Sequence, residues 1–247
     1  MNSLMCVVSI VLVTMVVGCQ KAGGPMERVS ERGVLFRTVT AGGIERKYAV
    51  YVPREYSPGQ PTPLIVFLNG SGECGTDGQK QLTQGLIPAV LSDPGAWPFI
   101  IVCPQKPDSK TQWIDHDELV MAVLAAAKDH WNIDTSRMYL TGLSQGGAGT
   151  WEVSTKHSGM FAAIAPICGY GSPTAELGKA LKSTPIWAFH GAKDDVVVPA
   201  KAEALVASVK AAGGDPKFTL FPDANHNSWD AAYRTQKLGE WFLSHHK

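Results

Sequence analysis

Residues 137–149 read Arg-Met-Tyr-Leu-Thr-Gly-Leu-Ser-Gln-Gly-Gly-Ala-Gly, and this stretch decides the fold. A short apolar run leads into the pentapeptide Gly142-Leu-Ser-Gln-Gly146, and a helix-compatible segment follows. This pattern is typical of a nucleophile elbow, a tight strand-to-helix turn that needs glycines beside the serine because a Cβ there would strike the neighbouring backbone. The turn places the hydroxyl at a helix N-terminus, where backbone N–H groups favour developing negative charge. Ser144 is therefore the candidate nucleophile.

Length and charge limit the class of protein. A chain of 247 residues suits one large α/β domain. Basic and acidic residues balance at 22 each, so charge gives no indication of a nucleic-acid partner or of binding to an anionic surface. We expect an enzyme-sized globular domain over residues 34–247.

The first 33 residues have a different character. Residues 1–18 carry no charge and include a long aliphatic run, which predicts a secretory signal peptide. The run ends in Val16-Val-Gly-Cys19, which resembles a bacterial lipobox and makes Cys19 the candidate lipidation site. A plain cleaved signal or an uncleaved anchor are the alternatives, and the usual Lys or Arg before the apolar run is missing. We expect residues 19–33 to be a tether, and the protein to be exported and to touch a membrane only through this lipid.

Three cysteines fall in the expected domain, Cys74, Cys103 and Cys168, and no pair has C-x-x-C spacing. A zinc site is therefore not expected, and neither is any other metal or cofactor. One disulfide is conceivable in an exported protein, but small buried thiols are the favoured interpretation.

Apolar runs alternate with helical patterns along the rest of the chain. A hairpin is predicted over 34–40 and 44–52, and strands over 64–68, 99–103, 138–141, 161–167, 185–190 and 217–221. Helices are predicted over 81–91, 117–130, the segment after Ser144, 200–211 and 229–243. Such alternation implies a mostly parallel sheet, in which the ligand site lies beyond the carboxyl ends of the strands.

A serine nucleophile needs a base and an orienting carboxylate. His226 follows the last predicted strand and precedes the last helix, which makes it the candidate base, whereas His190 ends a strand and is expected to bury its ring. Asp194 and Asp195 lie between Ser144 and His226 in the chain, in the Ser…Asp…His order of α/β-hydrolases. Spacing alone does not choose between the two aspartates.

Two N–H groups are the expected donors for a tetrahedral oxyanion. One belongs to Gln145, directly after the nucleophile, and the other to Ser71 in the glycine-rich loop 69–73. Trp113 and Trp229 are candidate substrate-binding residues, with core packing as the alternative, and Trp187 is expected in the core.

Several further segments carry a resemblance to a known family. They are Leu68–Glu73, Cys103–Gln105 with Trp113, Tyr139–Gly147, Trp187–Asp194 and His226–Asp230. Together they look like α/β-hydrolase esterases related to polyhydroxybutyrate depolymerases, feruloyl and acetyl xylan esterases and dienelactone hydrolases, a group also described as phospholipase/carboxylesterase or prolyl-oligopeptidase-like. The resemblance implies an α/β-hydrolase fold with an N-terminal antiparallel hairpin and helices on both sheet faces, and it selects Asp194 as the catalytic aspartate. Asn69 departs from it, because these proteins usually carry histidine there.

The expected function is an exported serine carboxylic-ester hydrolase without a cofactor, acting on short acyl, acetyl or feruloyl esters, including esters on plant polysaccharide. A serine peptidase of the prolyl-oligopeptidase type is the first alternative, although such enzymes usually carry a large gating domain for which these 247 residues leave no room. A non-catalytic surface lipoprotein is the second.

Overall fold

A computed structural model of the chain describes residues 30–247. The expected signal peptide at 1–18, the candidate lipidation site Cys19 and most of the expected tether lie outside the described residues. Over 30–247, no helix is both long and apolar enough to cross a membrane.

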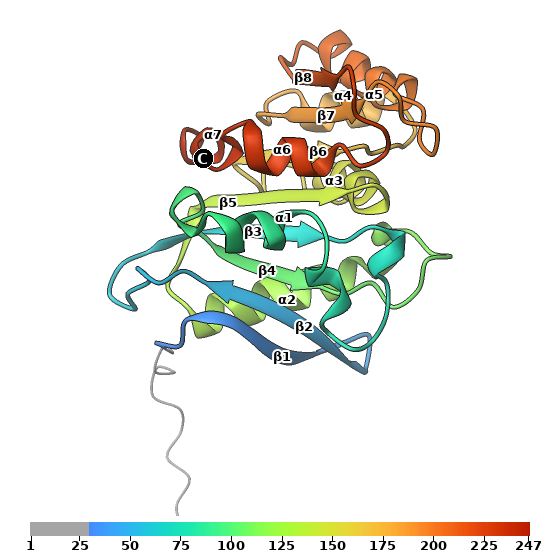
Figure 1. Cartoon of the computed structure of the whole chain (residues 1–247). Helices are drawn as coiled ribbons and strands as arrows, with labels where there is room; N and C mark the ends of the chain where they lie inside the picture. Colours follow the sequence, from blue (N-terminus) through green and yellow to red (C-terminus); the bar gives the residue numbers. More distant parts are fainter. Residues whose placement is uncertain (1–29) are drawn as a thin grey trace, which may run out of the picture.

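Eight strands form a single sheet in the order β1-β2-β4-β3-β5-β6-β7-β8 (Figure 1). The strands are β1 (Gly33–Ala41), β2 (Ile44–Val52), β3 (Thr62–Leu68), β4 (Ile100–Pro104), β5 (Ile133–Leu143), β6 (Ala163–Ile167), β7 (Trp187–Gly191) and β8 (Lys217–Phe221). Strand β2 runs antiparallel to both β1 and β4, and every other pairing is parallel. The predicted mostly parallel sheet with an antiparallel N-terminal hairpin is confirmed.

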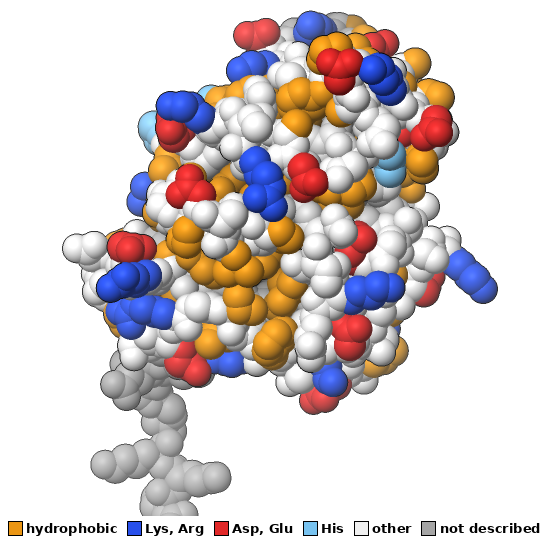
Figure 2. All heavy atoms as spheres, in the orientation of Figure 1, with side chains coloured by type: hydrophobic (Ala, Val, Ile, Leu, Met, Phe, Trp, Pro, Cys, Tyr) orange, Lys and Arg blue, Asp and Glu red, His pale blue; other side chains and the backbone are white. Residues whose placement is uncertain are grey.

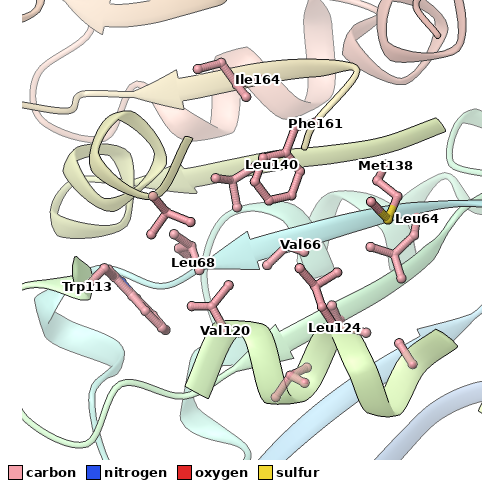
Figure 3. Close-up of a cluster of buried hydrophobic side chains, with 14 of the residues drawn as sticks. Leu64, Val66, Leu68, Trp113, Val120, Leu124, Met138, Leu140, Phe161 and Ile164 are labelled. Atoms are coloured by element: carbon pink, nitrogen blue, oxygen red, sulfur yellow. The ribbon is translucent and has the colours of Figure 1, made fainter. Parts of the chain in front are cut away.

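Helices cover both faces of this sheet. They are α1 (Leu86–Ser92), α2 (Asp117–His130), α3 (Gln145–Lys156), α4 (Ala175–Leu181), α5 (Ala200–Ala211), α6 (Trp229–Thr235) and α7 (Leu238–Leu243), with short 3₁₀ turns η1 (Ser71–Glu73), η2 (Lys80–Leu82), η3 (Pro94–Ala96) and η4 (Trp113–His116). Alternate residues of β3 point to opposite faces. Leu64 and Val66 pack with α2 and its neighbours, as Figure 3 shows, whereas Ile65 and Phe67 pack with α1, α6 and α7. The central strands are covered on both faces, which explains why their sequences are continuously apolar.

Two helix predictions need correction, and one helix was missed. The helix expected over 81–91 begins only at Leu86, because Gly85 has a φ of 73°, and a Cβ there would lie 2.5 Å from the side chain of Leu143. The helix expected over 229–243 is divided into α6 and α7, because Lys237 adopts the left-handed conformation with φ 51°. Helix α4 was not predicted, although its N-cap Thr174, whose hydroxyl accepts a hydrogen bond from the Leu177 N–H, is a usable signal.

The carboxyl ends of β3 and β5 point to the right in Figure 1, and the loops that leave them converge there. Both loops that carry the expected oxyanion donors therefore lie at one edge of the sheet. On the face drawn in Figure 2, acidic and basic side chains are interspersed, in keeping with the balanced charge of the sequence.

Candidate active site

The turn between β5 and α3 has the strained geometry of a nucleophile elbow. Ser144 has a φ of 54° and a ψ of −117°, which places it in the positive-φ region where side chains are rare. A Cβ on Gly142 would lie 2.4 Å from the carbonyl oxygen of Gly146, and a Cβ on Gly146 would lie 2.0 Å from that of Leu68. The glycines are therefore required by backbone that approaches from two sides.

Hydrogen bonds connect the three residues of the expected triad. The Nε2 atom of His226 lies 3.0 Å from the Oγ atom of Ser144, and its Nδ1 atom lies 2.8 Å from Oδ2 of Asp194. These contacts bring together the ends of β5, β7 and β8, which are far apart in the chain. An imidazole in this arrangement can take a proton from the hydroxyl while the carboxylate orients its ring.

Asp194 is held in place from its other side as well. Its side chain has no exposed surface, and Oδ1 accepts hydrogen bonds from the N–H groups of Val196 and Val197 at 3.0 and 2.9 Å. Burial raises the pKa of this carboxyl, but the hydrogen bonds from His226, Val197 and Val196 outweigh burial, so the pKa lies below its ordinary value. Asp195, the other candidate on spacing, is exposed to solvent.

The second histidine of this region also reaches Asp194. His190 is completely buried, as expected, and its Nε2 atom lies 2.8 Å from the carbonyl oxygen of Val197 and 3.1 Å from Oδ2 of Asp194. A carbonyl only accepts hydrogen bonds, so Nε2 carries the proton and donates it. His190 thereby joins the carboxylate to the turn that follows it.

Both expected oxyanion donors begin helical turns. Gln145 is the first residue of α3 and Ser71 is the first residue of η1, and the N–H groups at such positions have no partner within their own helix. Gly146 brings the two turns together, because its backbone is in close contact with the carbonyl groups of Leu68 and Asn69. The N–H groups of Gln145 and Ser71 thus begin two helical turns that meet beside Gly146.

Side chains behind these donors hold the loop after β4. The Nε2 atom of Gln145 donates to the carbonyl oxygens of Ser109 and Thr111 at 3.2 and 2.9 Å. The ammonium group of Lys106, which is fully buried, donates to Thr111 at 2.7 Å and to the Asp108 carbonyl. Sequence reasoning missed Lys106, because nothing local distinguishes a buried lysine after a strand from an exposed one.

The two candidate tryptophans have different environments. Trp113 has no exposed surface, which is what core packing, the alternative to substrate binding, predicts. Its indole N–H donates to the carbonyl oxygen of Asn69 at 2.9 Å. Trp229 is half-buried, and its ring meets that of His226 edge to face at a centroid separation of 5.5 Å. Trp187 lies in the core as expected.

The cysteines of the described region are unpaired thiols. Cys103 and Cys168 are buried and Cys74 is half-buried. Burial raises the pKa of Cys168 to about 12. Its Sγ atom lies 3.2 Å from the backbone nitrogen of Ser144, so this thiol packs against the elbow. Over residues 30–247, no group of three His, Cys, Asp or Glu side chains is placed to hold a metal ion.

Comparison with known proteins identifies sequence relatives of this chain. The sequence model of the dienelactone hydrolase family matches residues 105–234. A bifunctional acetylxylan esterase/xylanase of Neocallimastix patriciarum is 29% identical over 159 residues, which cover 63% of this chain but only 22% of that protein.

Solved structures share the fold. A thermostable esterase superposes with a TM-score of 0.76 at 30% identity, covering 87% of this chain and 63% of the other. A ferulic acid esterase of the anaerobic fungus Anaeromyces mucronatus gives a TM-score of 0.68 at 18% identity, covering 88% and 94% of the two chains. The chain therefore spans about a fifth of its curated relative and under two thirds of this thermostable esterase.

Proposed function

The chain belongs to the dienelactone hydrolase family, and from that premise we propose that it is a serine ester hydrolase that uses Ser144, Asp194 and His226. One observation carries the proposal: the continuous hydrogen-bonded relay from the serine hydroxyl through the imidazole to a buried carboxylate, with contacts of 3.0 and 2.8 Å. The hydroxyl is a poor nucleophile at neutral pH, and this relay is what activates it.

The proposed reaction has two halves. The Oγ atom of Ser144 attacks the ester carbonyl while Nε2 of His226 takes its proton, and the N–H groups of Gln145 and Ser71 stabilise the oxyanion. Collapse of this intermediate expels the alcohol, which receives the proton from His226. Water then attacks the acyl-enzyme with His226 again as base, and the carboxylic acid leaves.

The proposed substrates are short acyl, acetyl or feruloyl esters, including esters on plant polysaccharide. Two names support this choice: the curated relative is an acetylxylan esterase/xylanase, and a structural neighbour is a ferulic acid esterase. The half-buried Trp229 beside His226 offers an aromatic surface for such an acyl group. Exposed Val196 and Val198, which follow Asp194, add apolar surface nearby.

Hydrolysis of a series of p-nitrophenyl esters, from acetate to laurate, together with methyl ferulate, tests the proposal. Ser144→Ala is the control, and we expect it to remain folded while losing turnover. The acyl-length profile then measures the size of the acyl pocket. Turnover that persists in Ser144→Ala contradicts the assignment of the nucleophile.

Peptide substrates and a fluorophosphonate probe address the alternatives. Cleavage of peptide substrates without ester turnover favours a serine peptidase. A folded protein that neither turns over esters nor becomes labelled at Ser144 by a fluorophosphonate favours a non-catalytic binding protein. No contact in the described residues favours either one over the esterase.

We also propose that the protein is exported and lipid-anchored at Cys19, on the strength of the apolar segment and the lipobox-like sequence before it. In a bacterial host, the wild-type chain is expected in the membrane fraction with a lipid-modified N-terminal peptide by mass spectrometry. Cys19→Ser should release it from that fraction, and an unmodified Cys19 in a membrane-bound chain contradicts lipidation.

A further inference from the structure

The carbonyl of Gly70 and the N–H of Ser71 belong to one peptide unit. Because that unit is planar and trans, its C=O and N–H point in opposite directions. Whatever holds the carbonyl oxygen of Gly70 therefore also sets the direction of the Ser71 N–H, the expected oxyanion donor. The groups that contact this oxygen decide how well the donor is preorganised.

The shortest contact to this oxygen comes from the side chain of Asn69. Its Nδ2 atom donates to the Gly70 oxygen at 2.7 Å, and Asn69 has no exposed surface. The two other donors are more distant: the N–H of Glu73 at 3.3 Å and the thiol of Cys74 at 3.6 Å. The side-chain amide is thus the main restraint on the peptide unit.

The orientation of this amide is itself determined. Its Oδ1 atom accepts a hydrogen bond from the backbone N–H of Lys106 at 3.2 Å, so its nitrogen must face Gly70. The carbonyl oxygen of Asn69 accepts from the indole N–H of Trp113 at 2.9 Å, which holds the preceding peptide unit as well. Two consecutive carbonyl groups of the loop are therefore each held by a buried side-chain donor.

We propose that Asn69 is a positioning residue, whose side-chain amide aims the N–H of Ser71 at the developing oxyanion. This inference rests on the proposed ester hydrolysis, in which that N–H is one of two donors. Oxyanion donors are effective because their direction is set before the reaction, so no energy is lost in reorienting them in the transition state. Loss of the amide lets the peptide unit rotate, which weakens transition-state binding more than substrate binding.

Asn69→Asp and Asn69→Leu test this inference in the full-length protein. Both remove the N–H donor and keep the same number and branching of side-chain heavy atoms. Aspartate places an acceptor where the donor was, and leucine removes the polar groups without adding charge. Asn132→Asp is the matched control, because the Nδ2 atom of Asn132 also donates to a backbone carbonyl, that of Pro58, at 3.0 Å, outside the site. The measurements are kcat and KM for p-nitrophenyl acetate, the inhibition constant of a trifluoromethyl ketone, and the melting temperature.

We expect both Asn69 variants to lower kcat by roughly 10- to 100-fold, somewhat less than outright loss of an oxyanion donor, with KM little changed. The trifluoromethyl ketone adds to Ser144 and places an alkoxide at the oxyanion position, so its affinity should fall by the same factor as kcat. Asn132→Asp should leave kcat and inhibitor affinity unchanged, whatever it does to the melting temperature.

Three results overturn the inference: kcat within about threefold of wild type in both Asn69 variants, a loss of kcat without weaker inhibitor binding, or the same loss of kcat in Asn132→Asp. If one Asn69 variant does not fold, the other decides. Wild type and Ser144→Ala are measured alongside. A wild type without serine-dependent turnover overturns the proposed function and this inference together, whereas an active wild type with active Asn69 variants overturns only this inference.

Discussion

The Nε2 atom of His190 lies 3.1 Å from Oδ2 of Asp194, the same oxygen that faces His226 at 2.8 Å. One carboxylate oxygen is therefore in contact with two imidazole rings, one fully buried and one beside Ser144. The buried ring also donates to the carbonyl of Val197, at the far end of the turn that holds Asp194. The position of the carboxylate thus depends on a residue that has no exposed surface.

His190→Phe should weaken both stability and turnover. A buried carbonyl of Val197 left without its donor costs about 1–3 kcal/mol in the free energy of unfolding. A displaced Asp194 should lower kcat roughly tenfold or more. Urea unfolding and ester kinetics measure the two effects. His157→Phe is the control: it breaks a 2.8 Å contact with Asp117 away from the site, so stability alone should change.

Asp194→Asn and Asp195→Asn should differ by orders of magnitude in activity. An amide at position 194 favours the wrong tautomer of His226, and kcat should fall by about 10⁴. Asp195 is exposed and outside the relay, so kcat of its variant should stay within about twofold of wild type. Equal losses in both variants, at unchanged melting temperature, contradict the assignment of the orienting carboxylate to Asp194.

The lowered pKa of Asp194 makes stability depend on pH in the acid range. A carboxyl whose pKa is lower in the folded state stabilises the protein fully above its unfolded pKa, about 3.9 for aspartate. That contribution is lost as the pH falls through the pKa of Asp194 in the folded protein. The unfolding free energy of wild type minus that of Asp194→Asn should therefore decrease between neutral pH and pH values of about 3. A difference that is constant over this range contradicts the prediction.

Gly146→Ala should disrupt the elbow. The added Cβ would meet the Leu68 carbonyl oxygen at 2.0 Å, and backbone cannot yield as a flexible side chain does. Overpacking of this kind costs about 1–3 kcal/mol or more in the unfolding free energy, and displacement of α3 should also abolish turnover. Gly72→Ala is the stability control, because its Cβ would meet nothing within 4 Å. A Gly146→Ala protein that is as stable and active as wild type contradicts the close approach of the Leu68 carbonyl to Gly146.

Much of the architecture follows from local pattern. Continuous apolar runs mark strands that are covered on both faces, and the glycines of 41–43 mark the hairpin turn, so the sheet class is predictable without the structure. The ends of individual helices are less predictable. The division between α6 and α7 depends on one left-handed residue, Lys237, and the late start of α1 depends on how Gly85 packs against Leu143.

The residues of the candidate site also differ in how far the sequence predicts them. The positions of Ser144 and His226 in the chain are readable from the sequence, because the elbow needs its own glycines and because chain order places the histidine after the last strand. Which aspartate faces the histidine is not readable from spacing. The family resemblance selects Asp194, and the packed turn then shows that Asp194 is buried while Asp195 is exposed.

The residues alone thus predict a strand-to-helix turn that exposes a serine, since the apolar run, the serine and its flanking glycines are contiguous in the chain. Only the tertiary structure shows that Asp194, which spacing leaves level with Asp195, contacts His226, that Trp113 is buried behind the loop, and that Asn69 holds the Gly70 carbonyl. Each of these depends on contacts between segments far apart in the chain. Such contacts are set by how the sheet orders its strands, and no local pattern records them.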